Sequence, residues 1–343
     1  MTSASPIRTA LLAYGMSGKL FQAPFLAAHP GFDLHGVVER TEPRMHHDYP
    51  GIHRYPSVAE VLADPSIELI VVNTPSNTHF DLAQQALRAG KHVLLEKPVA
   101  TSVAQLQELL ALAKEAGRHL LAYQNRRWDT DFDAVARVVA SGQLGQLIEA
   151  HFRFDRYKPV LNPKKFKEDV LPGSGLMYDL GPHLVDQAIS LFGRPQRVHK
   201  IVGHYRVGTQ VDDYFSLHLR YGQGLNVWLT SGLLIADPGP AFVLHGTQGS
   251  YQKGRTDPQE AQLLAGMSPL APEYGREKPG EEGRLTLAAS DGSLTTQPDL
   301  AAPGSYLGLF EAVFQTIRHG APYPISNEHL LWQNELLEQT ASA

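Results

Sequence analysis

An aspartate and a histidine four residues apart, Asp179 and His183, form the most informative pair of polar side chains in the sequence. This spacing puts them one turn apart on one face of a helix, which we predict over residues 178–192. Pro182 is tolerated only in a first helical turn, so both side chains should lie near the helix N-terminus. There the imidazole could transfer a proton near neutral pH while the carboxylate orients it or a substrate hydroxyl. A capping aspartate beside a surface histidine also explains the pattern.

A lysine follows an apolar segment, residues 92–96, that we predict to be a buried strand. Pro98 lacks a backbone donor and stops the strand, which places Lys97 at the edge of the sheet. Ligands of open parallel sheets bind beyond the carboxyl ends of the strands. The Lys97 ammonium could bond a substrate hydroxyl or polarise a carbonyl, and a cationic nicotinamide nearby would lower its pKa. A solvent-exposed lysine at a strand end is the alternative.

A turn with two glycines connects the first predicted strand, residues 8–14, to the first predicted helix, residues 20–28. Glycine lets the backbone approach a pyrophosphate, and the helix N-terminus supplies N–H groups and a partial positive charge. Ala13 stands where the fingerprint G-x-G-x-x-G has its first glycine, and a plain tight turn is the alternative. The turn consists of Tyr14, Gly15, Met16, Ser17 and Gly18.

Two charged residues at the end of the second predicted strand bear on the choice of coenzyme. Glu39 could accept hydrogen bonds from the adenosine ribose, which favours NAD, whereas Arg40 could pair with a 2′-phosphate, which favours NADP. The sequence offers both side chains, so the coenzyme is predicted as NAD or NADP.

These candidate residues need a sheet that brings strand ends together, and the first part of the chain predicts one. Short apolar runs without polar alternation are each followed by a helical pattern, as in a parallel sheet covered on both faces. The predicted strands span residues 8–14, 33–39, 68–73, 92–96 and 120–123, and the predicted helices span residues 20–28, 58–63, 78–89 and 102–116.

The pattern changes after about residue 125, where apolar and polar residues alternate with a period of two. We therefore predict an α/β protein: a doubly wound Rossmann domain (1–124), an α+β domain on an open, mostly antiparallel sheet (125–325), and a C-terminal helix packing back on the first domain (326–343). Residues 252–303, rich in Gly, Pro and acidic residues, are predicted as a surface excursion. The other predicted strands span 148–156, 197–205, 213–221, 224–234 and 241–245, and the other helices 131–141, 305–319 and 327–340.

Composition excludes several classes of protein. The 30 Lys and Arg against 35 Asp and Glu give a net charge of −5 without a basic block, which argues against nucleic-acid binding. Cysteine is absent, which excludes disulfides, thiolate metal sites and cysteine nucleophiles. The 16 histidines show no H-E-x-x-H spacing, so no catalytic metal is expected. We expect neither a membrane span nor a secretory signal, and a cytoplasmic protein.

Taken together, the motifs resemble the glucose–fructose oxidoreductase/inositol dehydrogenase family (Gfo/Idh/MocA) over nearly the whole chain. Within that family the sequence looks most like the NADP-linked scyllo-inositol dehydrogenase branch, although Ala13 and Glu39 depart from the usual pattern. The resemblance is carried by residues 14–18, 74–79, 96–98, 125–129, 175–187 and 211–215.

The resemblance implies hydride transfer between nicotinamide C4 and a carbinol carbon of a sugar or polyol, with Lys97, Asp179 and His183 as catalytic residues. It further implies a homodimer or dimer of dimers formed through the open sheet. A coenzyme-binding regulator without chemistry and an NAD-dependent glycosidase are the two alternatives. The implied coenzyme contacts are Tyr14, Gly15, Met16, Ser17, Gly18, Glu39, Arg40, Thr74, Pro75, Asn77, His79, Glu96, Lys97, Asn125 and Trp128, and the implied substrate contacts are Lys97, Arg126, Arg153, Tyr157, Asp179 and His183.

Overall fold

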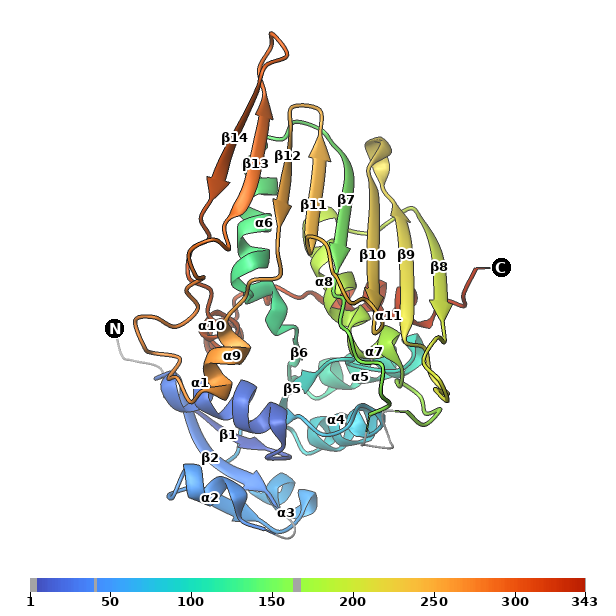
Figure 1. Cartoon of the computed structure of the whole chain (residues 1–343). Helices are drawn as coiled ribbons and strands as arrows, with labels where there is room; N and C mark the ends of the chain where they lie inside the picture. Colours follow the sequence, from blue (N-terminus) through green and yellow to red (C-terminus); the bar gives the residue numbers. More distant parts are fainter. Residues whose placement is uncertain (1–4, 40–41, 163–167, 343) are drawn as a thin grey trace. The chain divides into compact units, whose positions relative to one another are not determined.

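The computed structural model describes residues 5–39, 42–162 and 168–342. The chain divides into two compact units, each assembled from segments far apart in the sequence (Figure 1). The first unit combines the chain up to residue 125 with residues 260–274 and 305–331. The second unit combines residues 126–259, 275–304 and 332–343.

The first unit is built on a six-stranded parallel sheet with the strand order β3-β2-β1-β4-β5-β6. The predicted Rossmann sheet is therefore confirmed, with β3 as a short edge strand that the sequence analysis did not predict. Every residue of β4 and β6 is buried, as expected for strands covered on both faces. The strands are β1 (Ile7–Leu11), β2 (Phe32–Val38), β3 (His53–Tyr55), β4 (Leu69–Val72), β5 (His92–Glu96) and β6 (Leu120–Tyr123).

Helices of the first unit connect and cover these strands. The first crossover begins as a π-helix, η1 (Ser17–Gln22), and continues as α1 (Ala23–Ala28). A late segment, α10 (Leu307–His319), packs on α1 through the parallel rings of Phe25 and Phe310, whose centroids lie 5.6 Å apart. The other helices are α2 (Arg44–Asp48), α3 (Val58–Ala63), η2 (Ser76–Thr78), α4 (His79–Arg88), α5 (Val103–Glu115) and α9 (Gln259–Leu264), and η3 (Asn125–Trp128) spans the boundary between the units.

The second unit is built on an eight-stranded sheet with the strand order β14-β13-β12-β11-β7-β10-β9-β8. Among the described strand pairs of this second sheet, only β7 and β10 are parallel, so the predicted open, mostly antiparallel sheet is confirmed. The strands are β7 (Leu147–Arg153), β8 (Arg197–Gly203), β9 (Tyr214–Arg220), β10 (Asn226–Gly232), β11 (Phe242–Gly246), β12 (Gly249–Lys253), β13 (Gly283–Ala288) and β14 (Leu294–Asp299).

One face of this second sheet forms the core of the unit. Alternate strand residues pack there with side chains from α6 (Thr130–Ala140), α7 (Leu176–Asp179), α8 (Gly181–Phe192) and the last turns of α11 (Asn327–Glu338). The strand residues in between point to the opposite face and are half-exposed. We call this opposite face the open face; its described side chains include Glu149, His151, Arg153, Ser216, His218, Asn226, Trp228, Thr230, Val243 and His245.

Two sequence predictions about local structure were wrong. Residues 252–303 are not a plain excursion, because α9, β13 and β14 lie within them and β13 and β14 form one end of the second sheet. Alternation in this segment is weak beside its many turn residues, and β14 is largely exposed. The single helix predicted over 178–192 is two helices, because the backbone at Leu180 (φ −109°, ψ −24°) separates α7 from α8.

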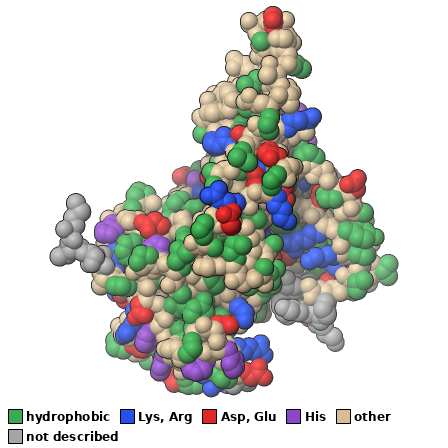
Figure 2. All heavy atoms as spheres, turned by 60° about the vertical axis from the view of Figure 1, so that its left-hand side comes forward, with side chains coloured by type: hydrophobic (Ala, Val, Ile, Leu, Met, Phe, Trp, Pro, Cys, Tyr) green, Lys and Arg blue, Asp and Glu red, His purple; other side chains and the backbone are tan. Residues whose placement is uncertain are grey.

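Histidine side chains gather at the lower end of the face shown in Figure 2, in the region where α2 lies in Figure 1. There His35 and His53 stack with ring centroids 5.8 Å apart.

Within the described ranges no group of three or more potential ligands is arranged to hold a metal ion. Nor does any described helix combine the length and apolar character needed to cross a membrane.

Candidate active site

The glycine turn of the first unit is held by a side chain from the neighbouring strand. The Asn73 amide, one residue after β4, accepts a hydrogen bond from Ala13 N at 3.0 Å and donates one to Ala13 O at 2.8 Å. A Cβ atom on Gly18 would lie 2.4 Å from Ala13 O, so a side chain does not fit there. A Cβ atom on Gly15 would have no neighbour within 4 Å, which leaves the backbone open to a pyrophosphate.

The helix after the turn is tied to the end of β5. Ser17 donates a hydrogen bond from its hydroxyl to the Glu96 carboxylate. Gln22 Nε2 donates to the same carboxylate oxygen at 3.0 Å. Both donors belong to the π-helix η1, a type of helix that occurs frequently at functional sites. The turn and the strand end that carries Lys97 are therefore directly connected.

Tyr14 lies at the start of the turn and contacts α2. Its hydroxyl donates to Asp48 Oδ2 at 2.6 Å, and Lys19 Nζ pairs with the same oxygen at 2.8 Å. These contacts, with Lys19 the largest, hold the pKa of Asp48 below its usual value. Met16, by contrast, is 61% exposed at the tip of the turn. Asp48 therefore anchors one side of the turn, a role that the sequence analysis did not assign.

Glu39 follows β2 at the same edge of the sheet. Its carboxylate oxygens accept from the backbone N–H of Met45 at 3.1 and 3.4 Å, and only 8% of the residue is exposed. Part of its hydrogen-bonding capacity is therefore used within the protein. Contact with the coenzyme ribose stays a prediction, and Arg40 lies outside the described residues.

The segment after β4 contains the predicted contacts Thr74, Pro75, Asn77 and His79. Pro75 and Asn77 are exposed, and Thr74 is half-buried. His79 is 2% exposed, and its two ring nitrogens contact two backbone carbonyls, Nε2 to Thr74 O and Nδ1 to Pro98 O, each at 2.8 Å. The ring of His79 therefore bridges the ends of β4 and β5.

Lys97 comes directly after β5 and is half-buried. Parallel strands bring their carboxyl ends to one edge, so Lys97 shares that edge with the glycine turn and Thr74. Asn125, the last residue of the first unit, is buried after β6. The first unit thus brings together the described residues predicted to bind coenzyme, apart from Trp128.

In the second unit, Asp179 and His183 lie on either side of the break between α7 and α8. Asp179 is half-buried and ends α7, whereas His183 is 6% exposed in the first turn of α8. Asp212 fixes the start of α7, because its carboxylate accepts from Met177 N at 2.6 Å. A Cβ atom on Gly175, whose φ is +86°, would clash with the Asp212 carboxylate at 2.0 Å.

A buried ion pair fixes α8 one turn after His183. Arg127 donates two hydrogen bonds to Asp186, from Nε at 2.7 Å and from Nη2 at 2.8 Å. Gln333 donates a third hydrogen bond to Asp186, at 2.6 Å. Gln187 donates from Nε2 to Arg126 O at 3.2 Å. Residues 126–127 are therefore held along the helix that carries His183.

Three guanidinium groups surround one aromatic ring in the same unit. The Cζ atoms of Arg126 and Arg156 lie 5.0 Å from the centroid of Phe154, and that of Arg255 lies 4.0 Å from it. Such contacts stabilise a cation over a ring face. Arg126 also pairs at 3.1 Å with Asp129, a fully buried carboxyl whose pKa is raised by burial and by Asp257.

The other predicted substrate contacts have different surroundings. Arg153 pairs with Asp155 at 2.8 Å and points to the open face. Tyr157 is 60% exposed and forms an isolated bridge with Leu234. Trp128, predicted to contact the coenzyme, is half-buried, and its carbonyl accepts from Gln259 at 2.8 Å. A common site of Lys97 with Asp179 and His183 stays a prediction.

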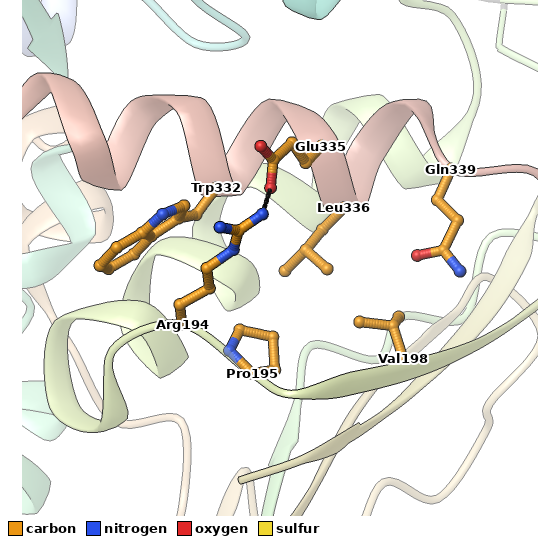
Figure 3. Close-up of a pocket in the computed structure, with 7 residues that line it drawn as sticks. All are labelled: Arg194, Pro195, Val198, Trp332, Glu335, Leu336 and Gln339. Carbon is orange, nitrogen blue, oxygen red and sulfur yellow. Dashed lines mark hydrogen bonds and ion pairs between the residues drawn. The ribbon is translucent and has the colours of Figure 1, made fainter.

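A separate small cavity in the second unit lies between α11 and the start of β8 (Figure 3). Its volume is about 140 Å³, below the roughly 300–1,000 Å³ typical of ligand sites. Arg194 and Glu335 form an ion pair of 2.6 Å at its side. The cavity is too small for the predicted reactants.

Asn73, Asp48 and Asp212 are the positioning side chains that sequence reasoning missed. Asp212 stood within a quoted motif. Asn73 ended the third predicted strand, and a polar residue directly after an apolar run is a signal that could have identified it. Asp48 gave no such signal, because its partners are 34 and 29 residues away in a segment without strong periodicity.

Comparison with known proteins places both units among oxidoreductases. A family profile described as "Oxidoreductase family, NAD-binding Rossmann fold" matches residues 7–124, and one described as "GFO/IDH/MocA C-terminal domain" matches residues 132–252. The first match contains all the strands of the parallel sheet, and the second contains most of the strands of the second sheet.

Individual relatives agree over almost the full length. The chain is 36% identical to the uncharacterized oxidoreductase YdgJ of Escherichia coli, covering 97% of this chain and 94% of that protein. It is 33% identical to scyllo-inositol 2-dehydrogenase (NADP(+)) IolW of Bacillus subtilis, covering 94% and 89%. The solved structure of an oxidoreductase from Bacillus cereus matches with a TM-score of 0.90 at 32% identity, covering 97% and 95%.

Proposed function

Because the chain belongs to the Gfo/Idh/MocA family of NAD(P)-dependent oxidoreductases, we propose that it transfers a hydride between NAD or NADP and a carbinol or carbonyl carbon of a sugar or polyol of the inositol type. The place of Lys97 carries this proposal. It follows a buried strand at the sheet edge that also holds the open glycine turn. The likeness to scyllo-inositol 2-dehydrogenase (NADP(+)) over 94% of the chain supports the substrate class.

The catalytic roles belong to Lys97, Asp179 and His183 in this proposal. The bound nicotinamide supplies or accepts the hydride. The Lys97 ammonium donates to the substrate oxygen and stabilises the negative charge that develops there. His183 takes the hydroxyl proton during oxidation and returns it during reduction. Asp179 holds the hydroxyl and the imidazole in register.

The coenzyme contacts in this proposal come from the first unit. The backbone at Gly15 would hold the pyrophosphate of a bound coenzyme, and the residues after β2, β4 and β5 would hold the rest of the dinucleotide. Residues 1–124 are accordingly the coenzyme domain, and residues 125–325 bind substrate and form the oligomer. The C-terminal helix, predicted to pack back on the first domain, instead contributes Leu336 and Leu337 to the core of the second unit. The cytoplasmic location remains a prediction.

The experiment begins with thermal-shift titrations of NAD and NADP, followed by a panel of polyols and aldoses monitored by the absorbance of the reduced nicotinamide. Lys97→Ala and His183→Ala should each lower kcat by roughly 10²- to 10⁴-fold, since each removes a group that acts on the transition state. Coenzyme affinity should survive in both variants. Full activity of both would contradict the assignment, and tight coenzyme binding without turnover would favour a regulator.

We also propose that two copies of the chain associate through the open face of the second sheet. The indole of Trp228 lies there between the rings of His151 and His218, with centroid distances of 4.8 and 4.5 Å. Ile201 on β8 is 45% exposed nearby in the same sheet. Gel filtration with mass measurement tests the proposal: a dimer or tetramer is expected, Trp228→Glu should dissociate it, and a wild-type mass of one chain would contradict it.

A further inference from the structure

At both of its ends, β5 is linked to the segments that flank β4 by one buried side chain each. At the carboxyl end, His79 contacts Thr74 O and Pro98 O, each at 2.8 Å. At the amino end, Lys91 donates from Nζ to Asp64 O at 2.6 Å and to Ile67 O at 2.9 Å. His79 and Lys91 are 2% and 6% exposed. The strand that leads to Lys97 is therefore held by buried side-chain contacts at both ends. The contact at Pro98 lies directly next to the lysine, whereas the contacts of Lys91 lie at the far end of the strand.

A second contact fixes the other neighbour of Lys97 in the sequence. The Glu96 carboxylate accepts from Ser17 and, at 3.0 Å, from Gln22 Nε2 of η1. Residue 96 is thus tied by its side chain to the helix after the glycine turn, and residue 98 is tied by its carbonyl to His79. Lys97 lies between these two anchored residues.

We propose that His79 and Glu96 are positioning residues that hold the backbone of Lys97 on both sides and so set the direction of its ammonium. This inference rests on the proposed hydride transfer, in which Lys97 meets the substrate oxygen. Displacement of a catalytic group by about 1 Å can cost about 100-fold in rate, so an anchor one residue away has a large effect. Neither His79 nor Glu96 needs to touch a reactant for this role.

The chemistry of the His79 ring adds to the argument. Carbonyl oxygens only accept hydrogen bonds, so both contacts are hydrogen bonds at once only when the ring carries two protons. Burial lowers the pKa of His79, and the charge of Lys97 lowers it further, against Pro98 O, Thr74 O and Glu96, which raise it. The lowered pKa favours the neutral ring, which donates to one of the two carbonyls at a time, so the proposal requires the tautomer that donates from Nδ1 to Pro98 O.

Two isosteric substitutions separate the two contacts of the ring. The amide nitrogen of asparagine replaces Nδ1 of histidine, and that of glutamine replaces Nε2. His79→Asn should therefore keep the bond to Pro98 O, whereas His79→Gln should keep only the bond to Thr74 O. We expect kcat to fall about 30-fold in His79→Gln and about threefold in His79→Asn. The melting temperature should fall by the same amount in the two variants, because each loses one of the two contacts of the ring. The coenzyme dissociation constant, measured by titration in both variants, separates any change in coenzyme binding from the change in kcat.

Lys91→Met provides the matched control. It removes two carbonyl contacts at the opposite end of the same strand, so it should lower the melting temperature by a few degrees without the loss of kcat seen in His79→Gln. A corresponding pair tests Glu96: glutamine still presents an acceptor to Ser17 and Gln22, whereas alanine does not. The kcat of Glu96→Gln should therefore be about tenfold higher than that of Glu96→Ala.

Hydrogen exchange in peptides covering residues 94–101 of the coenzyme-free protein gives a second measurement. Exchange should be faster in His79→Gln than in His79→Asn. Equal kcat losses in these two variants, or an equal loss in Lys91→Met, would overturn the proposal, because a merely structural role predicts no difference. If the wild type turns over no sugar or polyol, the proposed function fails, and the exchange comparison alone then decides whether Pro98 is the anchor.

Discussion

The two units of the molecule fix their polar side chains in different ways. At the sheet edge of the first unit, Asn73 and His79 bond to main-chain groups of neighbouring strands. Along α8 of the second unit, Arg127 and Asp186 bond to each other through charged groups. A main-chain partner survives most substitutions, whereas a charged partner must be matched by another side chain.

This difference has an energetic consequence. Breaking a neutral hydrogen bond costs about 1–3 kcal/mol when a buried partner is left unsatisfied, whereas removing one partner of a buried ion pair costs about 3–5 kcal/mol. The Asn73 and His79 contacts of the first unit should therefore respond to substitutions mainly through geometry, and the Arg127–Asp186 pair along α8 of the second unit mainly through charge balance.

The largest expected effect comes from removing the centre of the charge network in the second unit. Asp186 is 1% exposed and receives three hydrogen bonds from Arg127 and Gln333. Asp186→Ala should destabilise the region around α8 by about 3–5 kcal/mol, because the Arg127 guanidinium loses its carboxylate. Native-state hydrogen exchange of α8 measures this change. A loss of stability below about 1 kcal/mol in this region would show that the buried ion pair of the second unit is no more sensitive to substitution than the neutral contacts of the first.

The next effect concerns the geometry of the first unit. Gly18→Ala should cost about 2 kcal/mol or more, because its Cβ would lie 2.4 Å from Ala13 O and 2.8 Å from the Asn73 amide. Gly15→Ala meets nothing within 4 Å, so the protein should melt like the wild type while coenzyme affinity falls. Thermal unfolding and coenzyme titration of the two variants test this. Equal melting temperatures would show that the turn tolerates a side chain at both positions.

A pH experiment sharpens the comparison within the first unit. Burial, with smaller contributions from His119 and Arg118, lowers the pKa of His92 to about 4, and its Nδ1 accepts from His119 N at 3.0 Å. The ordinary value is 6.5, so the unfolded chain binds the proton first, and stability present above pH 6.5 is lost as the pH falls toward 4. We expect a loss of about 2 kcal/mol after allowance for partial exposure.

His92→Asn is the matched control for that experiment, because its amide oxygen replaces Nδ1 as an acceptor and does not titrate. Stability measured by urea unfolding between pH 7.5 and about 4.5 should fall less steeply in this variant than in the wild type. Parallel curves for the two proteins would show that other groups cause the acid sensitivity.

The smallest effect is expected at an exposed ion pair of the second unit. The side chains of Arg194 and Glu335 are 58% and 42% exposed beside the small cavity of Figure 3. Solvent screens such pairs, so Glu335→Gln should change stability by less than about 0.5 kcal/mol. A thermal-shift measurement suffices. A loss comparable to that of Asp186→Ala would show that burial does not distinguish the charged pairs of this unit.

The sequence predicted most of the parallel sheet because its strands are long, apolar and followed by periodic helices. It missed β3 because three residues, two of them exposed, show no periodicity. It also missed β12 and β13, which each begin with a glycine among turn residues, and β14, which is almost entirely exposed and carries no core pattern. Buried strands leave an apolar pattern in the sequence, whereas exposed strands at the edge of a sheet leave almost none.

The candidate site shows the same limit. The glycine turn, Lys97 and His183 were identified from local patterns around each residue. The contacts of Asn73 with Ala13 and of Asp212 with Met177 span 60 and 35 residues, and a single sequence does not record such pairings. Side chains that act through their own neighbourhood were predictable, and those that act by bridging distant segments were not.

The stack of Trp228 between two imidazoles gives the protein an internal optical signal. The ring planes deviate by only 7° and 6°, so the indole is sandwiched in a fixed environment on the half-exposed sheet face. Indole emission depends on the polarity and on the electron acceptors around the ring. Any surface that seats against this stack would displace water from it and shift its fluorescence. Emission recorded against protein concentration, with Trp228→Phe as the blank, would therefore follow association of the chains without an added label.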